Sequence, residues 1–200
     1  MTPEGQKRQD ERTAARKASP AAGPESRNVY ERCITRGLPG AMMPGFYNHN
    51  YHILQTPGYL VILVEMIHDV RIIPLSGRPH LDAAVRQWLG DSRGRWEGTT
   101  LVVETTNLKQ IDDRGVTAFG TSAAARVIER FTRLDADSID YQVTVDDPPM
   151  YTKPWTATIP MTKLDGGLYE YACHEGNYAL GGILAGARAE ERSAAGAAKK

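Results

Sequence analysis

The feature that most constrains the fold is a series of short runs rich in β-branched and aromatic residues, each bounded by turn-forming residues such as the Pro57-Gly58 pair. Runs of this length and composition predict β-strands. The predicted strands are Tyr59–Glu65, Val70–Leu75, Thr100–Thr106, Arg126–Arg133, Ser138–Val145, Trp155–Met161 and Leu168–Cys173. Because many short strands follow one another through short turns, the pattern favours an antiparallel meander, either a sandwich or a closed barrel.

Two segments carry a helical pattern instead. The stretch Leu81–Leu89 places apolar residues on one face and is followed by Gly90, a residue typical of a helix C-terminus. A second helix is expected from about Tyr178 to Glu191, where glycines interrupt a narrow apolar stripe. We therefore expect a mainly β protein: an antiparallel meander closing into a lipocalin-like β-barrel, with one short helix and a C-terminal helix.

The two ends of the chain differ in composition from its middle. Residues 1–28 are rich in charge and alanine and lack an apolar stripe, and residues 189–200 repeat this composition. Segments that have nothing to bury do not join a core. The sequence predicts a flexible charged N-terminal arm at 1–28, a single β-barrel domain at 29–188 and a fraying C-terminal tail at 189–200.

Charge and hydropathy argue against two classes of partner. The 24 Lys and Arg residues balance the 24 Asp and Glu residues, whereas domains that bind nucleic-acid phosphates carry a cationic excess. No apolar run approaches the roughly 18 residues that a membrane span needs, since Tyr59–Val64 is followed at once by Glu65. We expect no nucleic-acid partner and no membrane span, and the oligomeric state stays open.

The compartment and the state of the cysteines are linked. The first residues contain no apolar segment typical of a secretory signal, so we expect either a cytoplasmic protein or one whose signal has been removed. Cys33 and Cys173 lie near opposite ends of the predicted domain. They form either a disulfide that closes a long loop or two reduced, half-buried thiols, and the Cys33–Cys173 bridge is the prediction to test.

Two strings of residues are unusual, and they carry a resemblance. They are Gly94-Arg-Trp-Glu-Gly98, before a Leu-Val-Val strand, and Tyr169-Glu-Tyr-Ala-Cys-His-Glu-Gly-Asn-Tyr178. Together with segments 55–81, 86–107 and 127–148, they make the chain resemble, from about Arg32 to Glu191, a large family of uncharacterised, mostly exported bacterial proteins. The resemblance implies export to the periplasm, or secretion, after removal of a signal peptide. It implies no reaction.

The chain departs from the pattern of that family at two turn positions. Thr99 and Ser76 stand where an aspartate is common, and neither change affects the expected fold. The Gly-x-Trp sequence at a strand start, which ends here at Trp96, is also similar to lipocalin-like barrels, whose tryptophan closes one end. That likeness is an analogy of fold and says nothing about the ligand.

The richest polar string surrounds His174. An imidazole titrates near neutral pH, so His174 beside a carboxylate is a candidate general base. The candidate ligand contacts in the same string are Tyr171, Glu175, Asn177 and Tyr178. The alternative is that Glu175 and Asn177 cap the last helix and that His174 is an ordinary surface residue.

A second polar cluster surrounds the first predicted hairpin. Glu65 ends an apolar strand, so its carboxylate lies either in water at the rim or in a pair inside the protein. Arg71, across the turn, is its expected partner and suits a bound carboxylate or sugar hydroxyls. His68 completes a candidate catalytic set if it converges with Glu65 and His174 in one cavity. The alternative is an exposed turn with a cross-strand ion pair.

Metal and cofactor motifs are weak or missing. His49 and His52 are spaced His-x-x-His, but this spacing points both rings at one ion only on a helix, and the surrounding stretch is typical of a loop or strand. Phosphate-binding glycine loops and the Gly-x-Ser-x-Gly motif do not occur. We expect no metal and no cofactor.

Aromatic residues are the remaining candidates for a ligand site. Trp96 is a candidate ligand contact, and a wider aromatic set lines a pocket or fills the core: Trp88, Trp155, Tyr51, Tyr59, Tyr141, Tyr151 and Tyr178. The function expected first is a small-molecule-binding β-barrel of the bacterial periplasm, with an amphipathic, aromatic or sugar-like ligand. The alternative is a cofactor-free lyase, isomerase or hydrolase with a His/carboxylate acid–base pair in the barrel mouth. A structural or interaction module would have a wholly apolar interior.

Overall fold

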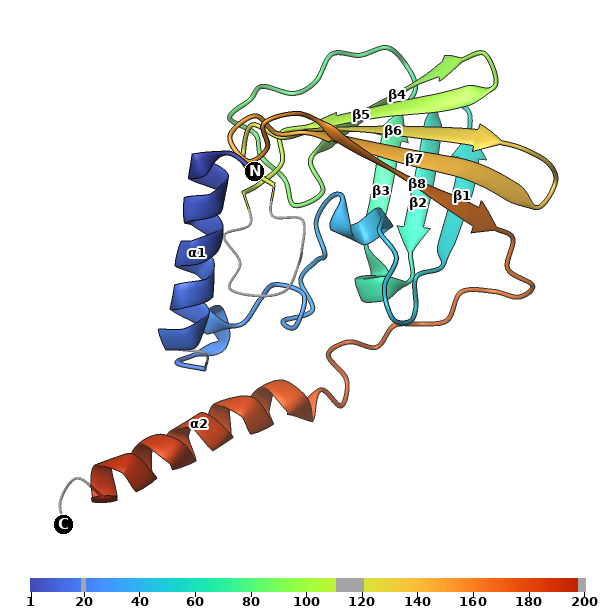
Figure 1. Cartoon of the computed structure of the whole chain (residues 1–200). Helices are drawn as coiled ribbons and strands as arrows, with labels where there is room; N and C mark the ends of the chain where they lie inside the picture. The colour runs from blue at the N-terminus through green and yellow to red at the C-terminus, as the bar shows by residue number, and fades with distance from the viewer. Residues whose placement is uncertain (19–20, 111–120, 198–200) are drawn as a thin grey trace.

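The described part of the chain folds around two antiparallel β-sheets (Figure 1). The computed structural model describes residues 1–18, 21–110 and 121–197. Its strands are β1 (Tyr51–Thr56), β2 (Tyr59–Val64), β3 (Val70–Pro74), β4 (Asp91–Glu97), β5 (Thr100–Thr106), β6 (Arg126–Arg133), β7 (Ser138–Asp146) and β8 (Trp155–Thr162). Its helices are α1 (Pro3–Ala18) and α2 (Tyr178–Ala197), with short 3-10 helices η1 (Pro24–Ser26), η2 (Gly40–Met42) and η3 (Met66–His68).

Each sheet is a meander of consecutive strands. Strands β1 to β3 form the smaller sheet and β4 to β8 the larger one. The register places Ile62 opposite Arg71 in the smaller sheet, and Phe131 opposite both Leu101 and Tyr141 in the larger. The expected mainly β, antiparallel fold is therefore confirmed. No strand pairing among the described residues joins the two sheets, so closure into a barrel is not established.

The hydrophobic core lies between the sheets because alternate residues of each strand point inward. The buried inward residues of β2 and β7 are Leu60, Ile62, Val64, Tyr141, Val143 and Val145. Helix η2 adds buried Ala41 and Met42 to the same core. The Tyr51 hydroxyl donates to the Ala41 carbonyl oxygen at 3.3 Å, so β1 holds η2 in place.

The predicted helix Leu81–Leu89 is wrong. The segment forms turns and a single bridge between Gln87 and Leu108. Asn107 explains the difference: its backbone has a φ of 55° and its side-chain amide donates to the carbonyl oxygens of Leu81, Asp82 and Val85 at 3.1, 2.9 and 3.2 Å. Carbonyl groups that a helix would use internally are bonded to a neighbouring loop instead.

Three strand assignments also change. The predicted strand Leu168–Cys173 is wrong, because this segment pairs with no sheet edge and its Tyr169 N–H bonds instead to the Glu65 carboxylate. The stretch around His49 and His52 was expected to be either a loop or a strand. Its residues from Tyr51 to Thr56 form strand β1, and each of them pairs with a residue of β2. Strand β4 (Asp91–Glu97) is not among the predicted strands.

The two terminal helices contact the body of the protein at few points. The Thr2 N–H donates to the Met150 carbonyl oxygen at 3.0 Å, so α1 begins against the turn that follows β7. Helix α2 confirms the expected C-terminal helix and contains no buried residue; it leads away from the sheets in Figure 1. Arg188 joins it to the Ala21 and Ala22 carbonyl oxygens at 3.1 and 2.8 Å. The division into arm, domain and tail stays a prediction.

The helices bear on the prediction that the chain contains no membrane span. None of the helices in the described residues is long and apolar enough to cross a membrane.

Candidate functional site

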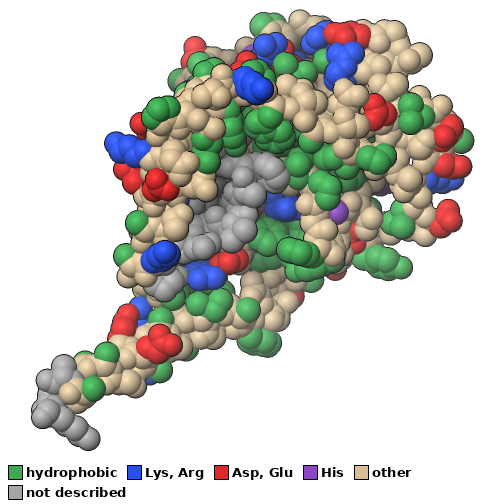
Figure 2. Space-filling model, viewed as in Figure 1, with side chains coloured by type: hydrophobic (Ala, Val, Ile, Leu, Met, Phe, Trp, Pro, Cys, Tyr) green, Lys and Arg blue, Asp and Glu red, His purple; other side chains and the backbone are tan. Residues whose placement is uncertain are grey.

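A cavity of about 770 Å³ lies between the two sheets, and its wall includes residues of one edge strand of each sheet, β1 and β8. This volume lies within the range of small-molecule sites. Figure 2 shows hydrophobic side chains gathered over the region where the two sheets meet. The cavity is the candidate functional site.

Much of the wall is apolar because it is built from inward positions of paired strands. The register aligns these positions from β5 across β6 and β7 to β8. The apolar wall residues on the strands include Leu60, Leu101, Phe131, Ile139, Ile159 and Met161. The apolar part of a ligand can therefore be buried against this wall.

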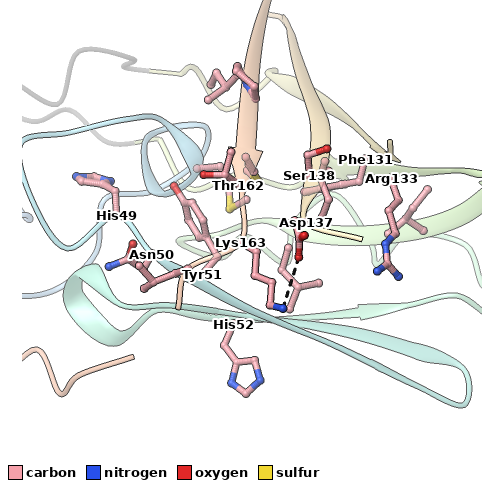
Figure 3. A pocket seen from close by; sticks show the side chains of 18 of the residues that line it. His49, Asn50, Tyr51, His52, Phe131, Arg133, Asp137, Ser138, Thr162 and Lys163 are labelled. Atoms are coloured by element: carbon pink, nitrogen blue, oxygen red, sulfur yellow. Dashed lines mark ion pairs between the residues drawn. The ribbon is translucent and has the colours of Figure 1, made fainter. Parts of the chain in front are cut away.

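The charged wall residues gather at one end of the cavity (Figure 3). Arg133 ends β6, Asp137 lies in the turn before β7, and Lys163 follows β8. The Lys163 Nζ atom lies 3.5 Å from the Asp137 Oδ1 atom, and both side chains are exposed. Antiparallel pairing of β7 with β8 brings the β6–β7 connection and the segment after β8 to the same edge.

The other end of the cavity carries neutral polar groups. Burial, with the nearby charge of Arg36, lowers the pKa of His49 to about 4, so this ring is uncharged at neutral pH. Burial raises the pKa of Tyr51 to about 12, so its hydroxyl stays protonated. The Arg36 Nη1 atom lies 2.9 Å from the ring nitrogens of His49.

Glu65, a predicted catalytic residue, lies outside the cavity wall and is buried. Its two carboxylate oxygens accept hydrogen bonds from the side-chain amides of Asn48 at 2.9 Å and Asn50 at 2.6 Å. Burial alone would raise the pKa of Glu65, but these bonds and one from the Tyr169 backbone outweigh it and lower the pKa. The geometry gives Glu65 a structural role in tying loop 48–50 to the segment at Tyr169.

The predicted Glu65–Arg71 pair is wrong. Arg71 points inward from β3 and binds both carboxylate oxygens of Glu129 on β6, with its Nη1 atom 2.8 Å from Oε1. Tyr141 donates to the same Oε1 atom at 2.9 Å. Arg71 and Glu129 share the interior because both occupy inward positions of strands in facing sheets, whereas Glu65 follows the last residue of β2. They form a buried link between the sheets.

The other residues predicted around His174 do not join Glu65. His68, His174, Glu175 and Tyr178 are exposed. The His68 backbone N–H donates to the Glu65 carbonyl oxygen at 3.1 Å, but within the described ranges no side-chain hydrogen bond or ion pair joins His68 or His174 to the Glu65 carboxylate. None of these residues belongs to the described cavity wall. The convergence that a catalytic set would need is absent from the described site.

Two predicted ligand contacts have clear positions. Trp96 lines the cavity and is 49% exposed, so a ligand in the cavity could contact it. Tyr171 lies elsewhere, where burial and hydrogen bonds with Tyr47 and Tyr30 raise the pKa of its hydroxyl.

The predicted disulfide is confirmed. Cys33 and Cys173 are bonded, with Cα atoms 5.7 Å apart and a sequence separation of 140 residues. The Asn177 side-chain amide lies 3.7 Å from the Cys33 Sγ atom. The bridge fixes the C-terminal segment just before α2 against the segment that precedes η2.

The His-x-x-His pair does not form a metal centre. His49 lies in the loop before β1, whereas the exposed His52 lies on β1, and Figure 3 shows their rings pointing in different directions. Among the residues described, no group of three or more His, Cys, Asp and Glu side chains is arranged to hold a metal ion.

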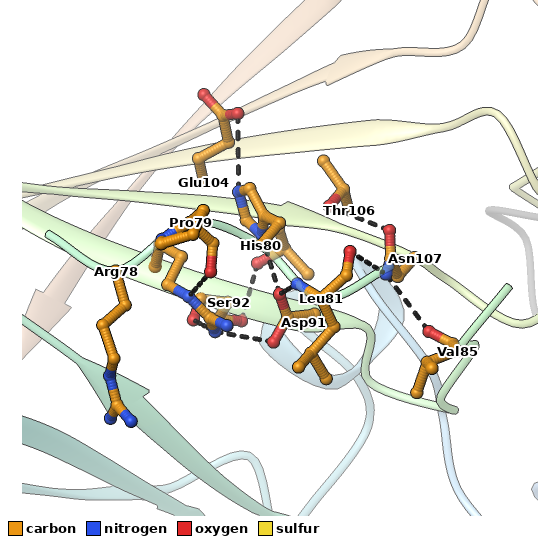
Figure 4. A network of polar contacts seen from close by, with 12 residues as sticks. Arg78, Pro79, His80, Leu81, Val85, Asp91, Ser92, Glu104, Thr106 and Asn107 are labelled. Atoms are coloured by element: carbon orange, nitrogen blue, oxygen red, sulfur yellow. Dashed lines mark hydrogen bonds and ion pairs between the residues drawn. The ribbon is translucent and has the colours of Figure 1, made fainter. Parts of the chain in front are cut away.

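A polar network around His80 was missed (Figure 4). The His80 Nδ1 atom lies 2.9 Å from Asp91 Oδ2, and its Nε2 atom lies 3.6 Å from Glu104 Oε1. The Leu81 N–H and Arg93 also donate to Asp91, at 3.0 and 2.6 Å. These bonds tie the segment between the sheets to β4 and β5. A polar residue at the start of a strand, such as Asp91, is the only sequence signal for this network.

Comparison with known proteins adds no relative. Neither a scan against protein-family models nor searches of curated proteins and of solved structures find a match to this chain.

Proposed function

We propose that this protein binds a small molecule in the cavity between its two sheets. The observation that carries the proposal is the cavity itself: about 770 Å³, with an apolar wall and polar groups at its ends. Small-molecule sites in proteins have this composition. The two sheets would then act as one incomplete lipocalin-like barrel, open between β1 and β8.

The cellular setting is part of the same proposal. The resemblance to exported bacterial proteins points to the periplasm, or to secretion. The Cys33–Cys173 disulfide supports this setting because disulfides persist in oxidising compartments. The acid–base alternative has less support, since the only carboxylate in the described wall, Asp137, pairs with Lys163 rather than with a histidine.

Filling the cavity tests the proposal. The neutral fluorophore N-phenyl-1-naphthylamine should bind wild-type protein saturably, and the variant Ile159→Trp should weaken binding at least about ten-fold by occupying the cavity. Thr158→Trp is the matched control, because Thr158 lies next to Ile159 on β8 but is exposed and outside the wall.

The melting temperature of each variant establishes that it is folded before its binding is compared. Equal binding by the wild type and a folded Ile159→Trp variant would show that the probe binds elsewhere. A thermal-shift screen of metabolites against the wild type, repeated with Ile159→Trp, then identifies ligands that need the cavity.

A further inference from the structure

We infer that the ligand is an amphipathic anion, with its hydrocarbon part against the apolar wall and its anionic group beside Arg133 and Lys163. This inference rests on the proposed function and adds the chemical class and orientation of the ligand. In Figure 3, Lys163, Asp137 and Arg133 lie on the side of Tyr51 that faces away from His49.

The wall residues at this end carry a net positive charge, and Asp135, which interacts electrostatically with Arg133, lies outside the wall. Arg133 and Lys163 contribute two cations and Asp137 one carboxylate to the described wall. The guanidinium of Arg133 is held in place, because its Nε and Nη2 atoms donate to the Asp135 and Ala136 carbonyl oxygens at 2.8 and 3.1 Å. A guanidinium fixed in this way still has N–H groups for a second, anionic acceptor.

A ligand can bind Lys163 with little loss of the interactions that this side chain already makes. Among the described residues Lys163 forms one ion pair, with Asp137 at 3.5 Å, and the two side chains are 64% and 71% exposed. Pairs this exposed contribute little to stability because water and salt screen them. An anionic ligand group can therefore replace Asp137 beside Lys163 without leaving a buried charge behind.

The opposite end of the cavity offers no comparable charge. His49 is neutral at pH 7 because its pKa is about 4. Arg36 is not part of the described wall: it lies against His49, and its guanidinium stacks over the Tyr30 ring at 5.6 Å from the ring centre. Among the described wall residues, Lys, Arg, Asp and Glu side chains therefore meet a ligand at one end only, which sets the orientation of its charged group.

Head-group chemistry is tested with three probes that share a twelve-carbon chain. Dodecanoate, dodecan-1-ol and dodecyltrimethylammonium compete with N-phenyl-1-naphthylamine at concentrations below micelle formation. We expect dodecanoate to bind about three- to ten-fold more tightly than dodecan-1-ol, the trimethylammonium probe to bind most weakly, and the preference to shrink as salt is added.

The location is tested with the double variant Arg133→Gln/Lys163→Gln. It should lose the preference for dodecanoate and keep its affinity for dodecan-1-ol, because the apolar wall is unchanged. Lys153→Gln is the matched control, since Lys153 is exposed and lies outside the described wall; it should keep the preference. A brominated dodecanoate should quench tryptophan fluorescence on binding, because Trp96 lines the cavity.

The outcomes separate this inference from the function on which it rests. Equal affinity for all three probes, lost together in Ile159→Trp, overturns the anion preference and leaves the binding function in place. A dodecanoate preference that survives in the double variant overturns the assignment to Arg133 and Lys163. Failure of every probe, the fluorophore included, to bind the wild type overturns both.

Discussion

Two buried carboxylates, Glu65 and Glu129, are stabilised in opposite ways. Glu129 is 0% exposed and its charge is balanced by Arg71, with a further hydrogen bond from Tyr141. Glu65 is 4% exposed and is held by neutral donors, the amides of Asn48 and Asn50 among them. Within the described chain, no Lys or Arg forms an ion pair with Glu65.

The difference follows from what each carboxylate joins. Glu129 links two sheets across the core, where an unpaired charge would be very costly. Burial alone would lower the pKa of Arg71, and the charge of Glu129 outweighs this and raises it. Glu65 organises loops near the surface, where dipoles of amides suffice to keep a carboxylate charged. The two sites therefore predict losses of different size when the charge is removed.

The largest effect is expected from Glu129→Gln. This variant leaves the Arg71 guanidinium, which is 3% exposed, without a balancing charge. Breaking a buried ion pair in this way costs about 3–5 kcal/mol, measured as the change in the free energy of unfolding in urea. The double variant Arg71→Met/Glu129→Leu should recover most of the loss, because it removes both charges. A loss below about 1 kcal/mol in Glu129→Gln would show that water reaches the pair.

Removing the disulfide is expected to act on the Glu65 region more than on the Glu129 pair. Cys173 lies four residues after Tyr169, whose N–H bonds to Glu65. Cys33→Ser/Cys173→Ser should lower the free energy of unfolding by about 2–4 kcal/mol. Hydrogen exchange should quicken around Glu65 and Tyr169 and stay slow in β6 and β7. Faster exchange throughout the chain would contradict this separation. Alkylation of both cysteines in unreduced wild-type protein would exclude the bridge.

A smaller loss is expected from Glu65→Gln. The amide keeps one acceptor for the Asn side chains but loses the charge that strengthened both bonds, at a cost of about 1–3 kcal/mol. The matched comparison is Glu129→Gln, the same chemical change at the balanced site. If Glu65→Gln lowers the free energy of unfolding more than Glu129→Gln does, the proposed difference between stabilisation by an opposite charge and stabilisation by neutral donors is wrong.

The difference in unfolding free energy between wild type and Glu65→Gln should depend on pH. The folded-state pKa of Glu65 is lowered, so ionised Glu65 adds stability above its unfolded pKa of about 4.3. This contribution disappears as the pH falls through the folded pKa. The difference in unfolding free energy between wild type and Glu65→Gln should therefore be constant near pH 7 and shrink below about pH 5. A difference that grows on acidification would contradict the sign of the shift.

The sequence predicts elements whose cause is local and misses contacts whose cause is distant. Runs rich in β-branched and aromatic residues, bounded by turn residues, predict β2, β6 and β7 closely. The Arg71–Glu129 pair spans 58 residues, although Glu129 stands at an inward position between buried Val127 and Phe131, which is a usable signal for a buried charge.

The sequence contains no comparable signal for the partners of Glu65 or for the shape of the cavity. Asn48 and Asn50 precede β1 in a loop whose path depends on how that strand pairs. The charged end of the cavity combines the end of β6 and the turn before β7, which hold Arg133 and Asp137, with the segment after β8, so the pairing of β7 with β8 is needed to bring Lys163 to the other two.

The smallest effect is expected on the outer face of the larger sheet, where charge pairs are exposed to water. Arg126 on β6 donates to Glu104 on β5, which also lies near His80. Glu104→Gln should cost no more than about 1 kcal/mol, because solvent already screens the pair. The loss should vanish in high salt, whereas the loss in Glu129→Gln should persist, because ions do not reach the core. A salt-resistant loss at Glu104 would mean that the His80 network, with its partly buried Asp91, supports the link between the sheets as strongly as the buried pair does.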